Sequence, residues 1–175
     1  MSERTSKQAE AREALACLRD GAVMAIGGSL FHNKPMSLVR EIARSGVRGL
    51  TVVAVTQASI DVDLLVAAGC VAEVRVPYLG LEHHGLAINF RRQVAEGKVK
   101  VWDCDETQVI AGMEAAAKNL PSGVTKTGVG TDLPRSNSAF KEIVDPFTGE
   151  SMIAVPAICP DVALIHATYG DQWGN

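Results

Sequence analysis

Short apolar segments alternate with longer segments of helical periodicity four times between residues 22 and 119. The apolar segments, which read as buried strands, are 22–26, 50–55, 71–78 and 98–104. The helical segments are 35–45, 61–69, 87–97 and 106–119. Because each strand is followed by a helix rather than a tight turn, we expect parallel strands joined by right-handed crossovers. The sequence therefore predicts an α/β fold, with an open, mostly parallel sheet and helices on both faces.

The composition excludes several classes of function. With 175 residues, 47% of them hydrophobic, the chain suits one globular domain, which we expect to span residues 1–175. A net charge of −3 and scattered basic residues argue against binding to nucleic acid or an anionic membrane. No apolar segment approaches the ~18 residues that span a bilayer. Four widely spaced cysteines without a C-x-x-C pair predict no metal site and a reducing, cytoplasmic location.

The two ends of the chain depart from the alternating pattern. Thr5 and Gln8 resemble a capping box and predict a first helix over residues 6–19. Residues 122–137 are rich in Gly, Ser and Thr and predict a long loop on the side of the active site, and a two-stranded hairpin follows around the turn 145–150. A last apolar strand within 161–170 precedes the turn 171–175 and would leave an exposed apolar edge. We therefore expect a longer natural chain whose C-terminal part is missing here.

The loops after the parallel strands are the expected place for ligands. In an open parallel sheet, ligands collect outside the carboxyl ends of the strands, so these loops should line one crevice. The candidate substrate-binding and catalytic residues on them are Gly27, Gly28, Ser29, Thr56, Gln57, Gly80, His83 and Glu106. This convergence follows from the topology and not from a single motif.

The glycine pair can be read in two ways. Gly27 and Gly28 could let the backbone approach a ligand and present N–H groups, or could simply form a tight turn after the strand. The pair belongs neither to a dinucleotide fingerprint nor to a P-loop. Ser29 has no G-x-S-x-G frame and is not expected to be a nucleophile. Lys34 is expected to be a solvated residue at the start of a helix.

The histidines do not predict a metal site. His83 and His84 are adjacent, so their side chains should diverge on a regular helix or strand. No cysteine or carboxylate completes a ligand set, and His83 is better placed for loop packing or for facing a substrate. His166 lies in an apolar segment and is expected to be a buried core residue.

An acidic turn precedes the last of the four helices. Asp105 is a good N-cap, and Gln108 three residues later completes a box-like start. Glu106 then lies in the first turn, where the helix dipole favours an anion. Glu106 is therefore either a dipole-matched surface acid or a group that points into the predicted crevice.

Three long segments resemble the first subunit of the class I coenzyme A transferases. "DGAVMAIGGSLFHNKPMSLVREIARSGVRGLTVVAV" is similar to the family's "DG…GGF…P…L…G…LT" pattern, and "NKP" is closest to the glutaconate type. "FRRQVAEGKVKVWDCDETQVIAGMEAAAKNLP" and "VDPFTGESMIAVPAICPDVALIHA" with the following "D..GN" resemble the later parts of that subunit. The resemblance covers nearly the whole chain.

The resemblance implies an acyl-CoA enzyme of two subunits or fused domains. In this family the nucleophile is the glutamate of a Ser-Glu-Asn-Gly motif on the second subunit, and that motif is absent from this sequence. This chain would then shape the acyl pocket and help to form the oxyanion hole. The coenzyme A thioester would be a substrate, with no permanently bound cofactor, and CoA would be transferred between carboxylic acids.

Glu106 departs from the pattern of several transferases in the family. There a glutamine opens the corresponding helix and stabilises the oxyanion, whereas an ionised carboxylate has no proton to donate. A related branch, which hydrolyses a carbon–carbon bond in steroid-ring catabolism, carries a glutamate at this place, and another branch decarboxylates a methylglutaconyl-CoA. The alternative function is thus hydrolysis or decarboxylation of an acyl-CoA, with Glu106 as general base.

A different class of function rests on analogy of fold. Sugar-phosphate isomerases and the effector-sensing domains of bacterial repressors share this kind of α/β fold. A sensor would carry a helix-turn-helix, which is not seen. A phosphate site would need basic residues near the loop of residues 27–34, which we call the glycine loop, and only Lys34 qualifies there.

Overall fold

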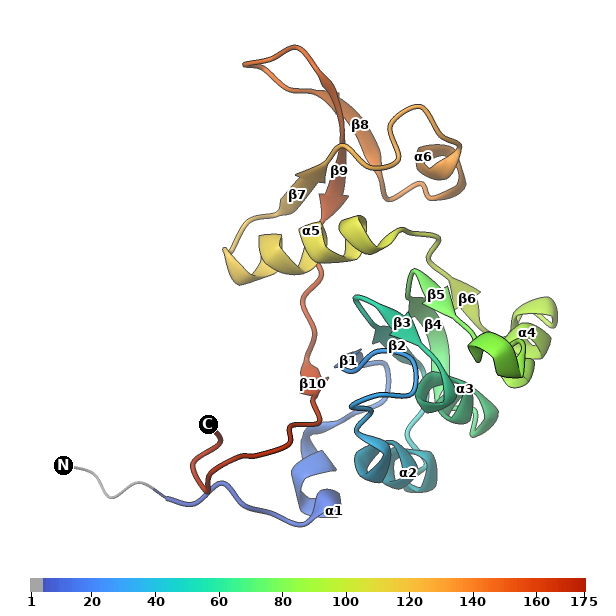
Figure 1. Cartoon of the computed structure of the whole chain (residues 1–175), viewed down its shortest axis with the longest axis vertical. Coiled ribbons are helices and arrows are strands. Elements are labelled where there is room, and N and C mark those ends of the chain that lie inside the picture. The colour runs from blue at the N-terminus through green and yellow to red at the C-terminus, as the bar shows by residue number, and fades with distance from the viewer. Residues whose placement is uncertain (1–4) are drawn as a thin grey trace.

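The computed structural model describes residues 5–175, so the first four residues of the predicted domain lie outside the described part (Figure 1). A five-stranded sheet has the order β10-β1-β2-β4-β6, and every neighbouring pair is parallel. Its strands are β1 (Val23–Ile26), β2 (Leu50–Val53), β4 (Val71–Arg75), β6 (Lys100–Val101) and β10 (Val162–Leu164). The predicted parallel α/β sheet is confirmed.

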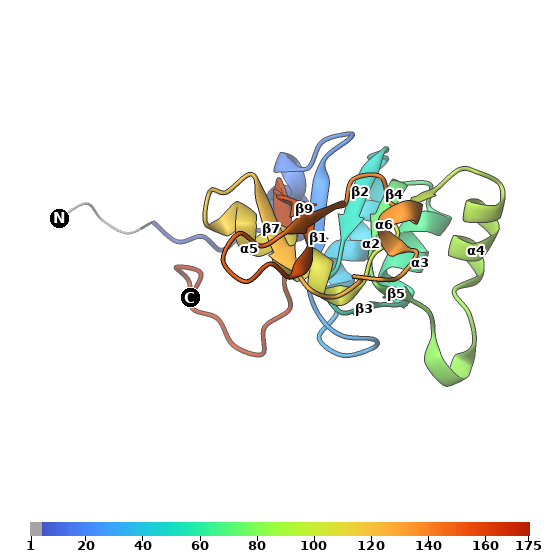
Figure 2. The same ribbon diagram turned by 90° about the horizontal axis from the view of Figure 1, so that it is seen from above.

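Helices cover both faces of this sheet, as predicted. They are α2 (Met36–Ser45), α3 (Ile60–Ala67), α4 (Ile88–Ala95) and α5 (Glu106–Ala117). Because side chains alternate across a strand, Val52 is buried in the core formed with α2 and α3, whereas Val53 belongs to a second apolar cluster that includes Val109 of α5. Figure 2 shows α4 at one end of the molecule and the C-terminus at the other.

The N-terminal prediction is wrong in its extent. Only α1 (Ala11–Ala14) and a short 3₁₀ turn η1 (Leu15–Cys17) form, and no side chain caps the first helix. The preceding backbone is extended and pairs with the C-terminal turn, because the Lys7 N–H donates to the Gln172 carbonyl at 2.7 Å. This tertiary contact competes with the local helix start that Thr5 and Gln8 would otherwise favour.

Two short strands form where the sequence predicts a loop and a strand end. β3 (Gln57–Ala58) lies in the predicted loop after β2 and pairs in parallel with β5 (Tyr78–Leu79). The predicted strand 71–78 is thereby divided at Pro77, which has no N–H to continue the ladder. The loops that leave β2 and β4 are therefore joined by backbone pairing.

The segment after α5 is more regular than its composition indicates. β7 (Ser122–Thr125) and the short helix α6 (Leu133–Ser136) replace much of the predicted long loop. β8 (Lys141–Val144) and β9 (Ser151–Pro156) form the predicted hairpin, and the three strands make an antiparallel sheet in the order β7-β9-β8. Gly123 lets β7 pack closely on α5, because a Cβ there would overlap the Ala111 carbonyl. Figure 1 shows α5 between the two sheets.

The last strand, β10, is an edge of the parallel sheet. It ends at Leu164, and Ile165 and His166 beyond it are exposed. The expectation of a buried His166 is wrong, because the apolar segment leaves the sheet before reaching it. None of the helices formed by residues 5–175 has the length and apolar character needed to cross a membrane.

Candidate active site at the carboxyl edge of the sheet

A cavity of about 420 Å³ lies at the carboxyl ends of β1, β2 and β10. Most of its walls are aliphatic, and one comes from Met113 of α5. The residues that line it are Ala25, Ile26, Gly27, Gly28, Ser29, Val53, Val55, Thr56, Met113, Ala163, Leu164 and Ile165. Gly27, Gly28, Ser29 and Thr56, four of the residues proposed from sequence, thus share one apolar cavity.

Gly28 is required by the shape of its own loop. Its φ of +89° lies in the left-handed region, and a Cβ would come within 2.5 Å of the Asn33 carbonyl oxygen. The tight-turn interpretation of this glycine therefore has a structural basis. Among residues 5–175, the Gly28 N–H has no protein acceptor, so it also remains a donor for a ligand.

Lys34 is buried, contrary to the expectation of a solvated residue. Only 6% of the residue is exposed, and its ammonium lies 3.0 Å from Asp61 Oδ2. The ammonium also donates to the carbonyls of Gly28 at 3.1 Å and Gln57 at 3.0 Å. Asp61 Oδ2 lies at ion-pair distance from the ammonium but without hydrogen-bond geometry. Because Lys34 is buried and its charge is balanced by Asp61, it is not placed to bind a phosphate.

The remaining loop residues lie outside the cavity lining. Gln57 contributes its backbone, which pairs with Tyr78 and accepts from the Leu30 N–H at 3.1 Å. Gly80 is buried against the ring of Tyr78, which a Cβ would overlap. These contacts bring three of the four predicted loops side by side without placing every side chain in the cavity.

The adjacent histidines do not diverge as expected. They belong to the 3₁₀ turn η2 (Glu82–His84), and the ring centroids of His83 and His84 are 3.9 Å apart. His83 is exposed, and the contact with the glycine loop is made by His84, whose ring meets Phe31 edge-on at 5.7 Å. Within the described residues, no group of three potential ligands could hold a metal ion.

The acidic turn forms the predicted capping box. Asp105 accepts from the Thr107 N–H at 2.9 Å, and Gln108 Oε1 accepts from the Asp105 N–H at 2.6 Å. Glu106 is the first residue of α5 and is exposed, and its carboxylate has no hydrogen bond or ion pair to residues 5–175. Because Asp105 already caps the helix, Glu106 is free for another role.

Glu106 and the cavity lie at different points along α5. Met113, which lines the cavity, follows Glu106 by seven residues and therefore shares its stripe of the helix. Two turns correspond to about 10 Å along the helix axis. Glu106 is outside the cavity lining.

Cys104 is unsuited to act as a nucleophile in this turn. Burial, together with the neighbouring carboxylates of Asp103 and Asp105, raises the pKa of the Cys104 thiol to about 12. The nucleophilic thiolate is therefore absent at neutral pH.

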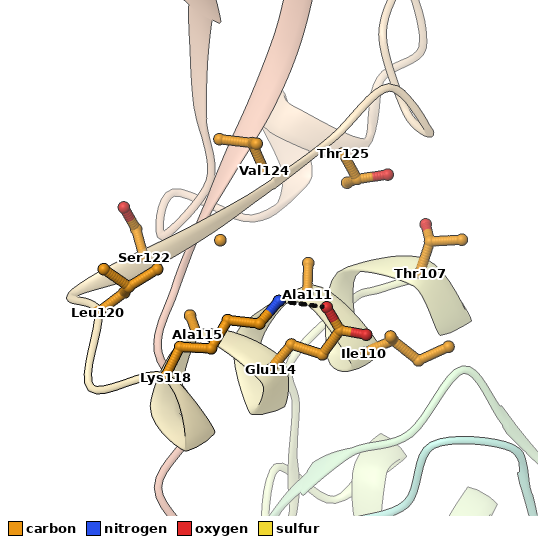
Figure 3. Close-up of a pocket in the computed structure, with 11 residues that line it drawn as sticks. Thr107, Ile110, Ala111, Glu114, Ala115, Lys118, Leu120, Ser122, Val124 and Thr125 are labelled. Carbon is orange, nitrogen blue, oxygen red and sulfur yellow. Dashed lines mark hydrogen bonds and ion pairs between the residues drawn. The ribbon is translucent and has the colours of Figure 1, made fainter.

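A second hollow of about 410 Å³ lies between α5 and β7 (Figure 3). Ile110, Leu120 and Val124 line it together with an ion pair of 3.2 Å between Glu114 and Lys118. Both partners of this pair are exposed, so the pair contributes little. None of the residues proposed from sequence lines this groove.

Met113 and the buried Lys34–Asp61 pair were not predicted from the sequence. The sequence does contain a pattern that could have indicated Met113, because it follows Glu106 at the helical spacing that places both residues on one stripe of the helix. No sequence pattern indicated that Lys34 is buried, because a lysine before Pro35 at a helix start is usually solvated.

Comparisons with known proteins support the same assignment of fold. A cholesterol ring-cleaving hydrolase IpdA subunit of Rhodococcus jostii is 34% identical over 100% of this chain and 61% of its own length. One subunit of a 3-oxoadipate CoA-transferase of Pseudomonas knackmussii is 34% identical over 90% of this chain and 56% of its own length.

Solved structures agree closely with this fold. The glutaconate coenzyme A-transferase of Acidaminococcus fermentans matches 97% of this chain with a TM-score of 0.86 and 28% identity, over 59% of its own chain. A variant of the decarboxylase AibA/AibB matches 97% of this chain with a TM-score of 0.85 and 29% identity, over 65% of its own chain.

The chain thus spans 56% to 65% of the length of these four proteins. The family model described as "Coenzyme A transferase" matches residues 8–175, which is almost the whole chain. The chain therefore belongs to the coenzyme A transferase family.

Proposed function

We propose that the chain is the first subunit of a two-subunit enzyme that transfers coenzyme A between carboxylic acids. The observation that carries this proposal is the apolar cavity at the carboxyl edge of the sheet, which Gly27 and Gly28 line. The chain that forms this cavity belongs to the coenzyme A transferase family. An aliphatic cavity suits the acyl part of a thioester. The glutaconate type of substrate remains the narrower proposal.

The proposed reaction proceeds through a glutamate of the partner subunit. That carboxylate attacks the thioester carbonyl, the CoA thiolate leaves, and an acyl anhydride forms. The thiolate then attacks the glutamyl carbonyl of the anhydride, releases the first carboxylic acid and leaves CoA on the glutamate. A second carboxylate accepts CoA by the reverse steps. The N–H of Gly28 is the proposed donor to the oxyanion of the thioester adduct.

The chain offers an exposed apolar hairpin tip for the partner subunit. Phe147, in the turn between β8 and β9, is 94% exposed, and Val144 at the end of β8 is 65% exposed. The hairpin extends from the rest of the molecule in Figure 1. Exposed apolar side chains of this size are typical of protein interfaces. They support a two-subunit assembly, as do the names of the related proteins, which are subunits of enzymes.

Hydrolysis of an acyl-CoA is the second candidate, and Glu106 is the observation that favours it. Its carboxylate is exposed, has no protein partner within residues 5–175 and lies at a helix N-terminus. An exposed carboxylate that no protein group engages is available to accept a proton, as a general base requires. In the transferase, Glu106 would instead border the thioester carbonyl and would have to be protonated to donate a hydrogen bond.

One experiment separates these two functions. The full-length protein, co-expressed with its second subunit, is incubated with acyl-CoAs in oxygen-18 water, with and without acetate, and the products are followed by mass spectrometry. Acetyl-CoA that forms only with acetate supports the transferase. A product that forms without acceptor and carries solvent oxygen supports the hydrolase.

The variant Glu106→Gln tests the role of the carboxylate in that assay. A hydrolase should lose turnover by about 100-fold or more, because a general base typically contributes 10²- to 10⁴-fold. Glu114→Gln is the matched control, since it removes an exposed carboxylate two turns further along α5. Full hydrolytic turnover of Glu106→Gln would end the hydrolase proposal.

The interpretation as a phosphate-binding protein loses its support. It depended on Lys34 as the basic residue near the glycine loop, and Lys34 is buried, ion-paired with Asp61 and hydrogen-bonded to the carbonyls of Gly28 and Gln57.

A further inference from the structure

We propose that Lys34 is a positioning residue that holds two loops of the acyl cavity at a fixed separation. This inference rests on the proposed function for its activity readout. Lys34 itself does not line the cavity. It acts through the carbonyls of Gly28 and Gln57, which belong to the loops that follow β1 and β2.

The contacts of Lys34 join three elements at one atom. Its Nζ lies 3.1 Å from the Gly28 oxygen, 3.0 Å from the Gln57 oxygen and 3.0 Å from Asp61 Oδ2. Asp61 lies in the first turn of α3, and its other oxygen accepts from the Ser59 N–H at 2.8 Å. The ammonium therefore links the glycine loop, the loop after β2 and the start of α3.

Other hydrogen bonds connect the same two loops. The Leu30 N–H donates to the Gln57 carbonyl at 3.1 Å, and the Ser59 hydroxyl donates to the Leu30 carbonyl. Thr56 Oγ1 donates to the Gly28 carbonyl at 3.4 Å, near the limit for a hydrogen bond. Both Gly28 and Thr56 line the cavity, so a change in loop separation changes its shape.

Stability alone does not require a charged pair at this position. The side chains of Lys34 and Asp61 are 2% and 0% exposed, so both charges have lost their hydration. A buried ion pair can often be replaced by neutral residues without loss of stability, whereas removal of one partner leaves an uncompensated charge. What a neutral pair lacks is the strong donor between the two loop carbonyls. The pair thus has a role in cavity geometry that can be separated from its role in folding.

The test uses the full-length protein in complex with its second subunit. Lys34→Met should destabilise the complex, because Asp61 is then buried without a counter-charge. The double variant Lys34→Met, Asp61→Asn removes that charge and should recover the melting temperature. We expect its KM for acyl-CoA to stay raised by about 10- to 100-fold, since small misplacements of binding groups have effects of that size. A wild-type KM in the recovered double variant would overturn the proposal.

Asp61→Asn alone is the second variant, because it keeps Lys34 and its two bonds to the loop carbonyls. We expect it to lower the melting temperature while the KM stays within about threefold of wild type. An increase in its KM as large as that of the double variant would contradict a role for Lys34 itself. Lys126→Met, which removes an exposed ion pair of 2.6 Å with Glu150, is the control and should change neither value.

Hydrogen exchange tests the inference without any enzymatic activity. In the double variant, the amides of residues 27–34 and 56–59 should exchange faster together, while those of β7 to β9 should not change. Unchanged exchange in both loops would refute the proposal. A complex that is inactive on every acyl-CoA, but shows the paired increase in exchange, would refute the proposed function and leave the role of Lys34 supported.

Discussion

Substitution of Gly28 by alanine should distort the glycine loop, and the structure allows the effect to be estimated. Its φ of +89° is unfavourable for an L-residue, which costs about 1–2 kcal/mol. The added Cβ would lie 2.5 Å from the Asn33 oxygen, where ordinary contacts begin at 3.4 Å, so the loop must move by about 0.9 Å. Overpacking of this kind typically costs ~1–3 kcal/mol. The expected total loss is about 2–5 kcal/mol in the free energy of unfolding.

Gly46 supplies a matched control within the same chain. It ends α2 with a φ of +85°, and a Cβ added there meets no atom within 4 Å. Gly46→Ala should therefore cost only the backbone component, about 1–2 kcal/mol. The difference between the two variants isolates the close approach of Gly28 to Asn33.

Urea denaturation of the purified protein measures both values through the midpoint and slope of unfolding. For a chain of this length, each kcal/mol also shifts the melting temperature by about 2–4 °C, which gives a second readout. Gly28→Ala should further weaken acyl-CoA binding, whereas Gly46→Ala should not. Equal stability losses in the two variants would refute the reasoning, because they would mean that the loop yields to the new Cβ without cost.

Four further predictions concern α5 and its surroundings. Asp105→Ala should lower the free energy of unfolding by about 0.5–2 kcal/mol through loss of the N-cap, and Asp105→Asn, measured by the same denaturation, should retain most of it. Cys104 should resist iodoacetamide at pH 8 in the folded protein while the exposed Cys17 reacts, as peptide mass spectrometry would show. Because the Cys104 pKa is raised to about 12 in the folded state, the thiol of the unfolded chain ionises first as pH rises. The free energy of unfolding of the wild type, relative to that of Cys104→Ala, should therefore fall between about pH 9 and pH 12. A difference between the two proteins that stays constant over this range would contradict the prediction. Gly112→Ala should be destabilising by calorimetry although alanine favours helices by ~1 kcal/mol, because its Cβ would lie 2.7 Å from Ile158, a fully buried side chain; a raised melting temperature would show that Ile158 can move aside.

The parallel sheet and the capping box could be predicted because both are local patterns. Alternation of apolar segments with helical periodicity determines which segments become β1, β2, β4 and β6, and the helix that connects each strand to the next favours parallel pairing. The box at Asp105 and Gln108 needs only residues three apart, so no distant contact can be missed. The end of α2 at Gly46 was predictable for the same reason.

The errors in the predicted elements arise where distant segments pair. The backbone before α1 stays extended because Lys7 pairs with the C-terminal turn. β7 forms because residues 122–125 pair with β9, about thirty residues later in the chain. Composition rich in Gly, Ser and Thr cannot distinguish such a strand from a loop. His166 is exposed because β10 ends at Leu164, a boundary that an apolar segment does not mark.

The sequence by itself determined the topology, and the topology determined that the loops after the strands meet at one edge. Only the tertiary structure decided which side chains line the cavity there. Thr56 and Met113 line it, whereas Glu106 lies two turns away on the same helix. Lys34 shows the reason most clearly, because burial of its charge depends on Asp61 and on two carbonyls brought together by separate strands. No pattern of neighbouring residues carries that information, since the free energy of a buried charge depends on partners that only folding brings within 3 Å or so.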